Sequence, residues 1–359
     1  MGPPKTGTSA VQKWLSCNQS FLKDHGVFYP SHSVDANGVS SGNVKSFYDR
    51  DENNQLSLNK VRLTNLISNF ISSKHSILLL SSEYFFREMD VLKFHIPNAK
   101  FIAYVRNPLE VRESSYNQSV KRHCQLEKMN IGRIKRLPNM DGLVEFTATY
   151  SPKDLYLRLY GVQYFKGGNI VSDLLSVIGI EVNVKLPVVN NSYQFEALEF
   201  KRWFNQFHLE YYQVIVDTAL QGFDEGSSHY SLIPEEQYIE DSTYYAGVLE
   251  SYARELKTLD LEPLVAHMKS ACSKPYLAQE LSENRFLLVC QYLQKNLQLD
   301  YYLMTIDIMP LTPVQNTQFH DLFIRSCNKK FRYLYLMLRV RAQLRKVVKS
   351  SIKALSLKF

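Results

Sequence analysis

Apolar residues recur at helical spacing in the first part of the chain. Val11, Trp14 and Leu15 lie on one face of a predicted helix that ends near Gly26. Residues 61–71 repeat this spacing, so a second amphipathic helix is predicted there. We assign Trp14 to the core-facing side of its helix and not to a binding surface.

Two short, continuous apolar runs predict strands that are buried on both faces, as in a parallel sheet. Residues 77–80 read ILLL and residues 101–105 read FIAYV. A segment of helical length separates the two runs. Residues 77–105 therefore have the form of a strand–helix–strand unit.

The rest of the chain divides into a polar stretch and a long helical half. Residues 31–58 are rich in Ser and Asn and are predicted to be loop. Residues 155–160 predict another strand, followed by a turn at Gly167-Gly168 and a helix. From about Ser192 onward the pattern is mostly helical.

A helix start follows the second predicted strand. Asn107 is a favourable N-cap, Pro108 suits the first helical position, and Glu110 suits the first turn. The sequence therefore predicts a helix that begins just after Arg106 and carries Ser114.

Composition indicates a globular protein. The chain has 359 residues, of which 45% are hydrophobic and 21% charged, which excludes wholesale disorder. No apolar run approaches the roughly 20 residues of a membrane-spanning helix. The first residues do not have the pattern of a secretory signal. The five cysteines are scattered, which argues against a disulfide framework and a structural zinc site.

The positive charge is concentrated near the end of the chain. The formal net charge of the chain is +7. Residues 322–359 hold eleven Lys and Arg and no Asp or Glu, so the formal net charge of residues 1–321 is −4. We expect the basic segment to dock on the acidic body, with an anionic membrane surface as the second alternative. No nucleic-acid motif accompanies the charge, so nucleic acid is not expected as a partner.

The start of the chain predicts an anion site. Residues 2–9 read GPPKTGTS and run directly into the first predicted helix. Glycines let backbone N–H groups turn inward, the helix start adds partial positive charge, and Lys5 adds a full one. The hydroxyls of Thr6, Thr8 and Ser9 are further donors. Together these groups suit a phosphate or sulfate.

This loop differs from that of nucleoside-triphosphate-binding proteins. Gly2 and Gly7 have the right separation, but Thr8 stands where that motif requires lysine. The strand at 77–80 is followed by the sequence SSE and not by the aspartate that holds magnesium. A small-molecule kinase of the P-loop type is therefore the weaker alternative.

Two motifs resemble those of the sulfotransferase family. Residues 4–9, PKTGTS, resemble the family's 5′-phosphosulfate loop. Residues 106–108, RNP, with Ser114 eight residues after the arginine, resemble its 3′-phosphate motif. The two motifs occur in the expected order, about 100 residues apart. Residues 1–250 carry the wider similarity to microbial sulfotransferase-like proteins.

The resemblance implies a three-layer, P-loop-like α/β fold, in which helices flank a parallel sheet, and a helical C-terminal extension. It implies the co-substrate 3′-phosphoadenosine 5′-phosphosulfate (PAPS), no metal, and transfer of the sulfuryl group to a hydroxyl or amine, above all of a carbohydrate. We expect the core with the PAPS site in residues 1–195, its helical completion in 196–270, and an extension with the basic arm in 271–359.

The resemblance also assigns residues to the site. Those expected to bind PAPS are Pro4, Lys5, Thr6, Gly7, Thr8, Ser9, Arg106 and Ser114. Lys5 would also stabilise the charge that develops on the leaving oxygen, and Arg106 would grip the 3′-phosphate through two hydrogen bonds. The expected general base is Glu83, which stands where the family carries this residue, and Glu88 and His95 are its rivals.

One departure concerns the start of the chain. Relatives of this kind have an apolar strand immediately before the loop, at the centre of the sheet, whereas no strand precedes Gly2 here. Without it, the neighbouring strands would lack backbone partners. We expect either that the sequence is a fragment without this strand or that the protein has lost activity.

The acceptor and the cellular location follow from charge. The basic stretch 121–136 follows the Arg106 helix and is expected to border the acceptor cleft, which favours an acidic glycan. We expect a cytoplasmic enzyme that contacts the inner membrane surface through residues 322–359. The remaining alternative is a non-catalytic relative that binds a partner or a membrane through that segment.

Overall fold

A computed structural model describes residues 5–32, 42–53, 55–185, 192–270 and 273–327. The protein is a mixed α/β structure, 57% helical, with short parallel strand pairs. The predicted α/β class is therefore confirmed, whereas the three-layer P-loop-like arrangement stays a prediction. Pro4 and most of the basic segment 322–359 lie outside the described residues.

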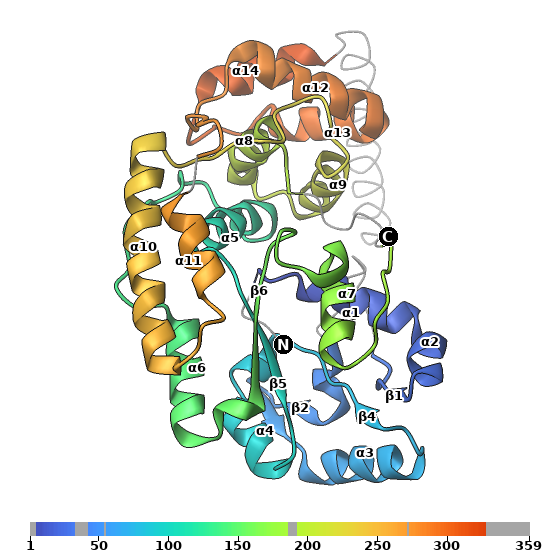
Figure 1. The fold of residues 1–359 in the computed structure, drawn as a ribbon. Coiled ribbons are helices and arrows are strands. Elements are labelled where there is room, and N and C mark those ends of the chain that lie inside the picture. The colour runs from blue at the N-terminus through green and yellow to red at the C-terminus, as the bar shows by residue number, and fades with distance from the viewer. Residues whose placement is uncertain (1–4, 33–41, 54, 186–191, 271–272, 328–359) are drawn as a thin grey trace, which may run out of the picture. The chain divides into compact units, whose positions relative to one another are not determined.

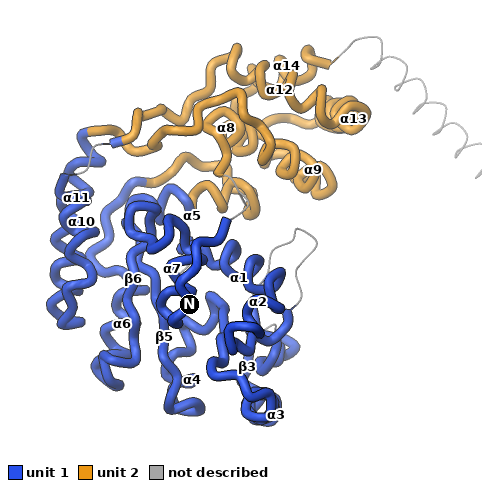
Figure 2. The backbone as a smooth tube through the Cα atoms, turned by 45° about the vertical axis from the view of Figure 1, so that its right-hand side comes forward, with its two compact units in different colours: residues 1–114, 131–189, 236–273 blue, residues 115–130, 190–235, 274–359 orange. Residues whose placement is uncertain are grey.

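The chain forms two compact units, each assembled from three separate stretches (Figure 2). Unit 1 comprises residues 1–114, 131–189 and 236–273, and unit 2 comprises residues 115–130, 190–235 and 274–359. Stretches of one unit alternate along the sequence with stretches of the other. The sequence prediction has three consecutive domains and no such alternation, and this division stays a prediction.

Helices α1 (Thr8–Cys17) and α2 (Gln19–Asp24) form where a single helix is expected. Leu15 on α1 is buried in the core of unit 1. Trp14 packs against the same core and makes an edge-to-face contact with Phe21, with ring centroids 5.6 Å apart. The assignment of Trp14 to the core is therefore confirmed.

Two pairs of parallel strands form in unit 1. Strand β1 (Val27–Phe28) pairs with β4 (Ile77–Leu78), and β5 (Phe101–Val105) pairs with β6 (Leu155–Leu159). The predicted strands are confirmed. The strand–helix–strand unit expected over 77–105 is wrong in its pairing, because β4 and β5 belong to different pairs.

An apolar cavity of about 630 Å³ lies between these pairs. Leu78 of β4, Ile102 of β5 and Leu174 of helix α7 (Ile170–Val177) line it, together with Thr6 of the loop. Among the described residues, β4 and β5 are each paired along one edge only. Residues 1–4 lie outside the described residues, so the expectation that a strand is missing ahead of the loop stays a prediction.

The stretch expected to be loop over 31–58 holds more structure than its composition indicates. Its described part contains the 3₁₀ helix η1 (Gly42–Ser46) and an antiparallel hairpin of β2 (Tyr48–Arg50) and β3 (Leu56–Leu58). The loop prediction is wrong for this part. A few buried aromatic residues among many polar ones are enough to anchor the hairpin, and Phe47, for example, is fully buried.

Helices flank the β5–β6 pair on both sides. The helices of unit 1 not yet placed are α3 (Lys60–Ser72), α4 (Met89–His95), α6 (Pro138–Thr149), α10 (Glu235–Leu256) and α11 (Glu262–Lys269). Helices α6, α10 and α11 lie on one side of the pair, and α1 and α7 on the other (Figure 1).

Helix α5 (Pro108–Arg122) begins where the sequence predicts it. The side-chain oxygen of Asn107 accepts a hydrogen bond from the backbone N–H of Leu109 at 2.9 Å, which caps the helix. Residues up to Ser114 belong to unit 1 and the later ones to unit 2.

A buried carboxylate fastens β5, β6 and α7 together. Asp173 of α7 accepts hydrogen bonds from the Tyr104 hydroxyl of β5 at 2.8 Å, from Nε of Arg158 of β6 at 3.1 Å, and from the backbone N–H of Lys166 at 2.9 Å. Burial alone would raise the pKa of Asp173, but these hydrogen bonds outweigh it and lower that pKa overall. The contacts fix the end of β6 beside the end of β5.

Unit 2 is built from helices packed around aromatic rings. Its helices are α8 (Phe195–Phe204), α9 (Glu210–Leu220), α12 (Glu283–Leu297), α13 (Leu299–Ile308) and α14 (Thr317–Ser326). All of α8 is buried, and its Trp203 contacts the rings of Phe286 and Phe323. The helical second half is therefore confirmed for the described residues. Within these, no helix combines the length and hydropathy needed to cross a bilayer.

Candidate functional site

The loop before α1 has a left-handed backbone at two positions. Lys5 and Gly7 have left-handed φ angles of 74° and 72°, and α1 begins at Thr8 without a side-chain cap. The first N–H groups of a helix lack partners within it and carry partial positive charge. A Cβ at Gly7 would lie 2.9 Å from Cε2 of Tyr160, so the turn requires glycine.

Arg106 connects the end of β5 to this loop. Its Nη1 donates to the carbonyl oxygen of Lys5 at 2.9 Å, across 101 residues of sequence. Its Nε donates to Oε2 of Glu110 at 3.0 Å, and its guanidinium lies 4.8 Å from the ring centroid of Tyr160. The structure thus brings together the two basic residues on which the sequence prediction depends. A two-bond grip on a phosphate would have to use Nη2 and the second hydrogen of Nη1.

Tyr160 and Glu110 are not among the site residues predicted from the sequence. The parallel register pairs Val105 with Leu159, so the next residues, Arg106 and Tyr160, are neighbours. The sequence indicates both strands but not their register. Glu110 stands four residues after Arg106, in the first turn of α5. Opposite charges at this spacing meet on a helix, and this signal could have indicated the pair.

Glu83 lies beside the same loop. It directly precedes the 3₁₀ helix η2 (Tyr84–Phe86), and its Oε1 accepts a hydrogen bond from the hydroxyl of Thr8. The side chain is exposed, so solvent and small molecules can reach the carboxylate. Its role as a general base stays a prediction.

The charged groups at the loop influence one another. Burial lowers the pKa of the half-buried Lys5, the Glu83 carboxylate raises it, and Arg106 lowers it further. Lys5 is therefore within electrostatic range of both residues. Lys5 and Arg106 are balanced in formal charge by Glu83 and Glu110, so the partial positive charge at the start of α1 is the remaining attraction for an anion.

The other predicted site residues are placed less favourably. Thr6 is only 1% exposed, and the hydroxyl of Thr8 is occupied by Glu83. This differs from the expectation that both hydroxyls are offered to an anion. Ser9 is half-buried in the first turn of α1. Ser114 is half-buried on α5, and among the described residues no hydrogen bond joins it to Lys5 or Arg106.

The two rival bases have other partners. Oε2 of Glu88 accepts a hydrogen bond from the Tyr48 hydroxyl at 3.1 Å. His95 is the last residue of α4, and its ring lies edge-on to Phe94 with centroids 5.0 Å apart. In the described part of the chain neither has a hydrogen bond to the loop. Glu83 is thus the best-placed of the three candidates.

The basic stretch 121–136 is largely ion-paired. The pairs are Arg122 with Asp217, Lys128 with Glu280, Arg133 with Glu240 and Asp241, and Arg136 with Asp141 and Glu255. Lys121 lies over the ring of Tyr193, 4.2 Å from its centroid. These partners reduce the charge that the stretch offers to an acidic acceptor, whose preference stays a prediction.

No cluster of three or more His, Cys, Asp or Glu side chains suited to a metal ion occurs among the residues that the structure describes. Comparison of the chain with protein-family models, with curated proteins and with solved structures finds no match. The functional assignment therefore depends on the two motifs and on the geometry described above.

Proposed function

We propose that the protein is a PAPS-dependent sulfotransferase whose donor site comprises the Lys5 loop and Arg106. The observation that carries this proposal is the hydrogen bond from Arg106 Nη1 to the carbonyl of Lys5. It holds two cationic residues, distant in sequence, beside the start of α1. PAPS has one anionic group at its 3′ position and another at its 5′ position, so two adjacent cationic sites match it.

The reaction would be an in-line displacement at sulfur. The acceptor oxygen attacks the sulfur atom, and the bond from sulfur to the bridging oxygen breaks. The electron pair leaves on that oxygen, which gives adenosine 3′,5′-bisphosphate. Lys5 and the N–H groups at the start of α1 stabilise this developing charge.

Glu83 would accept the proton of the acceptor hydroxyl. The hydrogen bond from Thr8 occupies its Oε1 and directs the incoming proton to Oε2. Thr8 is thus a positioning residue in this scheme, because it acts on the acceptor only through Glu83.

The acceptor class follows from the resemblance and from charge. A carbohydrate hydroxyl is the first candidate, and an acidic glycan is favoured only if the ion pairs of residues 121–136 open. A transfer assay with labelled PAPS on matched neutral and acidic oligosaccharides separates these classes. Incorporation into neutral glycans alone would contradict the acidic preference.

We also propose that the enzyme is cytoplasmic and contacts anionic membranes through the basic segment 322–359. Arg325, at the end of α14, is a described member of this segment. Anionic phospholipids attract clusters of basic residues, and salt weakens this attraction. Sedimentation with phosphatidylglycerol vesicles, but not with phosphatidylcholine vesicles, is the expected result; equal sedimentation with both would contradict it.

Isothermal titration of the full chain with adenosine 3′,5′-bisphosphate tests the donor site. We expect binding by the wild type and a loss of about tenfold or more in both Lys5→Ala and Arg106→Ala, because each removes a charge-assisted contact of at least about 1.5 kcal/mol. Lys13→Ala and Arg87→Ala, at exposed positions of unit 1, are matched controls and should bind as the wild type does.

Three outcomes would redirect the assignment. No binding by the wild type, or equal binding by Arg106→Ala, contradicts the proposed donor site. Magnesium-dependent binding of ATP with no binding of the bisphosphate indicates a kinase. Bisphosphate binding without turnover on any acceptor indicates a non-catalytic relative.

A further inference from the structure

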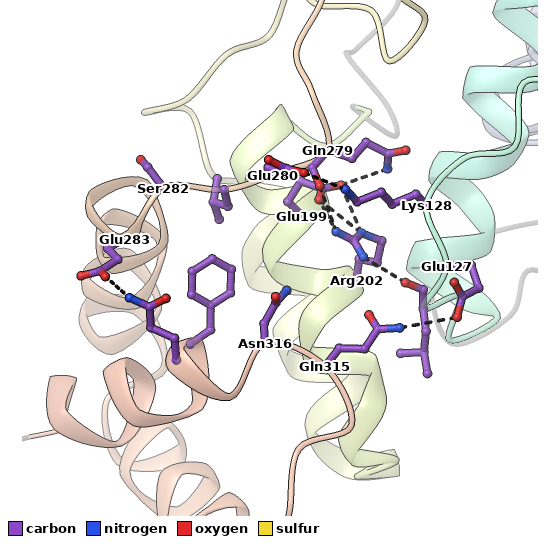
Figure 3. Close-up of a pocket in the computed structure, with 14 residues that line it drawn as sticks. Glu127, Lys128, Glu199, Arg202, Gln279, Glu280, Ser282, Glu283, Gln315 and Asn316 are labelled. Atoms are coloured by element: carbon purple, nitrogen blue, oxygen red, sulfur yellow. Dashed lines mark hydrogen bonds and ion pairs between the residues drawn. The ribbon is translucent and has the colours of Figure 1, made fainter.

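Unit 2 contains a polar cavity of its own, of about 870 Å³ (Figure 3). Its lining comes from residues 126–128, from helix α8, and from two segments, 279–283 and 315–319, that lead into α12 and α14. All of these residues belong to unit 2, whereas the donor site proposed above belongs to unit 1. The volume is that of a small-molecule site.

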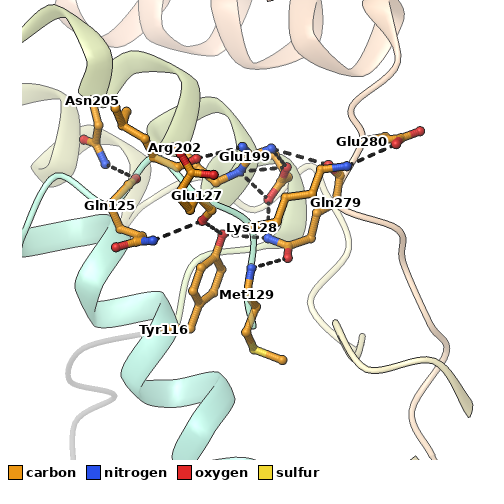
Figure 4. Close-up of polar contacts among 11 residues, drawn as sticks. Tyr116, Gln125, Glu127, Lys128, Met129, Glu199, Arg202, Asn205, Gln279 and Glu280 are labelled. Atoms are coloured by element: carbon orange, nitrogen blue, oxygen red, sulfur yellow. Dashed lines mark hydrogen bonds and ion pairs between the residues drawn. The ribbon is translucent and has the colours of Figure 1, made fainter. Parts of the chain in front are cut away.

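A buried ion pair, Arg202 with Glu199, is part of the lining of the cavity, and Figure 4 shows the polar contacts around it. The side chains of Arg202 and Glu199 are 7% and 1% exposed. Arg202 also donates to the carbonyl oxygens of Leu126 at 3.0 Å and of Gln279 at 3.4 Å. Gln279 Nε2 in turn donates to Oε1 of Glu199 at 3.1 Å and to the hydroxyl of Tyr116 at 2.6 Å. These bonds hold the ion pair in one arrangement before any ligand arrives.

Other polar side chains that line the cavity are joined in pairs. The pairs are Lys128 with Glu280, Glu127 with Gln315, and Glu283 with Gln318. Carboxylates accept hydrogen bonds, and amides both donate and accept them. The cavity therefore offers both kinds of partner at its rim, which is what a ligand with several hydroxyl groups requires.

The charge of the cavity disfavours an anion. The Glu199–Arg202 and Lys128–Glu280 pairs are neutral overall, whereas Glu127 and Glu283 face amides and not cations. The starts of α12 and α14 each add about +0.5 charge. The two carboxylates and the two helix starts together give the cavity a net charge of about −1, so a neutral polar ligand fits better than an acidic one.

One wall of the cavity is aromatic. Phe319 lines it, and its ring stacks on that of Phe286, with centroids 4.4 Å apart and planes inclined by 13°. Phe286 is fully buried, so the Phe319 ring is held in place by packing. A fixed ring among hydrogen-bonding groups suits a ligand that has an apolar face and a polar edge.

We propose that this cavity binds a neutral saccharide. The C–H face of a sugar ring would pack on Phe319, and its hydroxyl groups would exchange hydrogen bonds with Glu127, Gln315 and Gln318. This site shares no residue with the donor site in unit 1 and does not depend on the proposed sulfuryl transfer.

Titration of the full chain with three trisaccharides tests the proposal. The probes are maltotriose and the trimer of N-acetylglucosamine, both neutral, and trigalacturonic acid, which is acidic. We expect millimolar or tighter binding of at least one neutral probe, and about tenfold weaker binding of the acidic one. Phe319→Ala should weaken neutral binding about fivefold or more, since aromatic contacts are worth about 1 kcal/mol. Phe94→Ala, an exposed aromatic position in unit 1, is the matched control.

The proposal is overturned if neither neutral probe binds, if the acidic probe binds better, or if Phe319→Ala binds as the wild type does. Gln315→Ala is the second variant, because it alters the rim without touching the aromatic packing, and it should also weaken neutral binding. Binding of adenosine 3′,5′-bisphosphate should be unchanged in both variants. Failure of the saccharide site is therefore distinguishable from failure of the donor site.

Discussion

Arg106 makes three contacts that fix its orientation before a ligand binds. Nη1 contacts the Lys5 carbonyl, Nε contacts Glu110, and the guanidinium face lies on Tyr160. A preorganised cation loses less side-chain entropy when it binds an anion. Glu110 offsets the charge of Arg106 and Glu83 that of Lys5, so the start of α1 provides most of the remaining attraction.

At the residue scale, Glu83→Gln tests the proposed base. The amide oxygen can still accept the hydrogen bond from Thr8, so the loop contact is retained, but the amide cannot take a proton. We expect kcat for sulfuryl transfer to fall about 100-fold or more, with binding of adenosine 3′,5′-bisphosphate unchanged. Glu88→Gln, which alters a carboxylate bonded to Tyr48, should retain wild-type turnover. Equal activity of Glu83→Gln and wild type would exclude Glu83 as the base.

A second residue-scale prediction concerns pH and Asp173. Its pKa is lowered in the folded protein, so its contribution to stability is complete above the unfolded value of about 3.9 and is lost as pH falls through the folded pKa. Asp173→Asn should lower the free energy of unfolding at pH 7 by about 2–4 kcal/mol, because Arg158 loses its buried partner. Urea denaturation between pH 7 and pH 2 should show a constant difference between the two proteins down to about pH 4 and convergence below it. A constant difference across this range would contradict the assignment.

At the scale of elements, the site depends on where three elements end. Helix α1 starts at the loop, and strands β5 and β6 deliver Arg106 and Tyr160 side by side through their parallel register. The Asp173 contacts hold that register. The sequence predicts each of these elements, but pairing between strands depends on contacts far apart in the chain. This is why Tyr160 is visible only in the structure.

Gly7→Ala tests the packing of the loop against Tyr160. Gly7 and Gly168 have the same left-handed φ of 72°, but a Cβ at Gly168 meets nothing within 4 Å. Gly168→Ala should therefore cost only the left-handed penalty of about 1–2 kcal/mol. Gly7→Ala should cost more in urea unfolding and should also weaken binding of adenosine 3′,5′-bisphosphate. Equal effects of the two substitutions would show that the contact with Tyr160 has no energetic role.

The cavity between β4 and β5 gives a second prediction at this scale. The cavity is apolar, and the strands beside it are each paired along one edge among the described residues. The test adds five apolar residues ahead of Gly2, because β5 is five residues long. The added segment should pair with these strand edges and bury apolar surface. Thermal unfolding should shift upward by about 2–4 °C per kcal/mol gained. An extension of five Gly and Ser residues is the control, and equal melting of the two proteins would contradict the prediction.

At the scale of the whole molecule, two units alternate along one chain. Helix patterns and strand positions follow from local residue types, and the predicted helices and strands are confirmed where the structure describes them. The phosphate-binding role of the loop stays a prediction. The assignment of stretches to units depends on tertiary contacts, so hydropathy patterns do not reveal it. The polar cavity of unit 2 could not be predicted from the sequence for the same reason, because its lining joins residues as distant in sequence as Glu127 and Gln315.

The most direct test of the account compares two nucleotides that differ only in the 3′-phosphate. Adenosine 3′,5′-bisphosphate and adenosine 5′-monophosphate are titrated into the wild type and into Arg106→Ala. The account predicts that the wild type prefers the bisphosphate by about tenfold or more, and that Arg106→Ala binds both nucleotides equally and weakly. A full preference for the bisphosphate in Arg106→Ala, or no preference in the wild type, would contradict it.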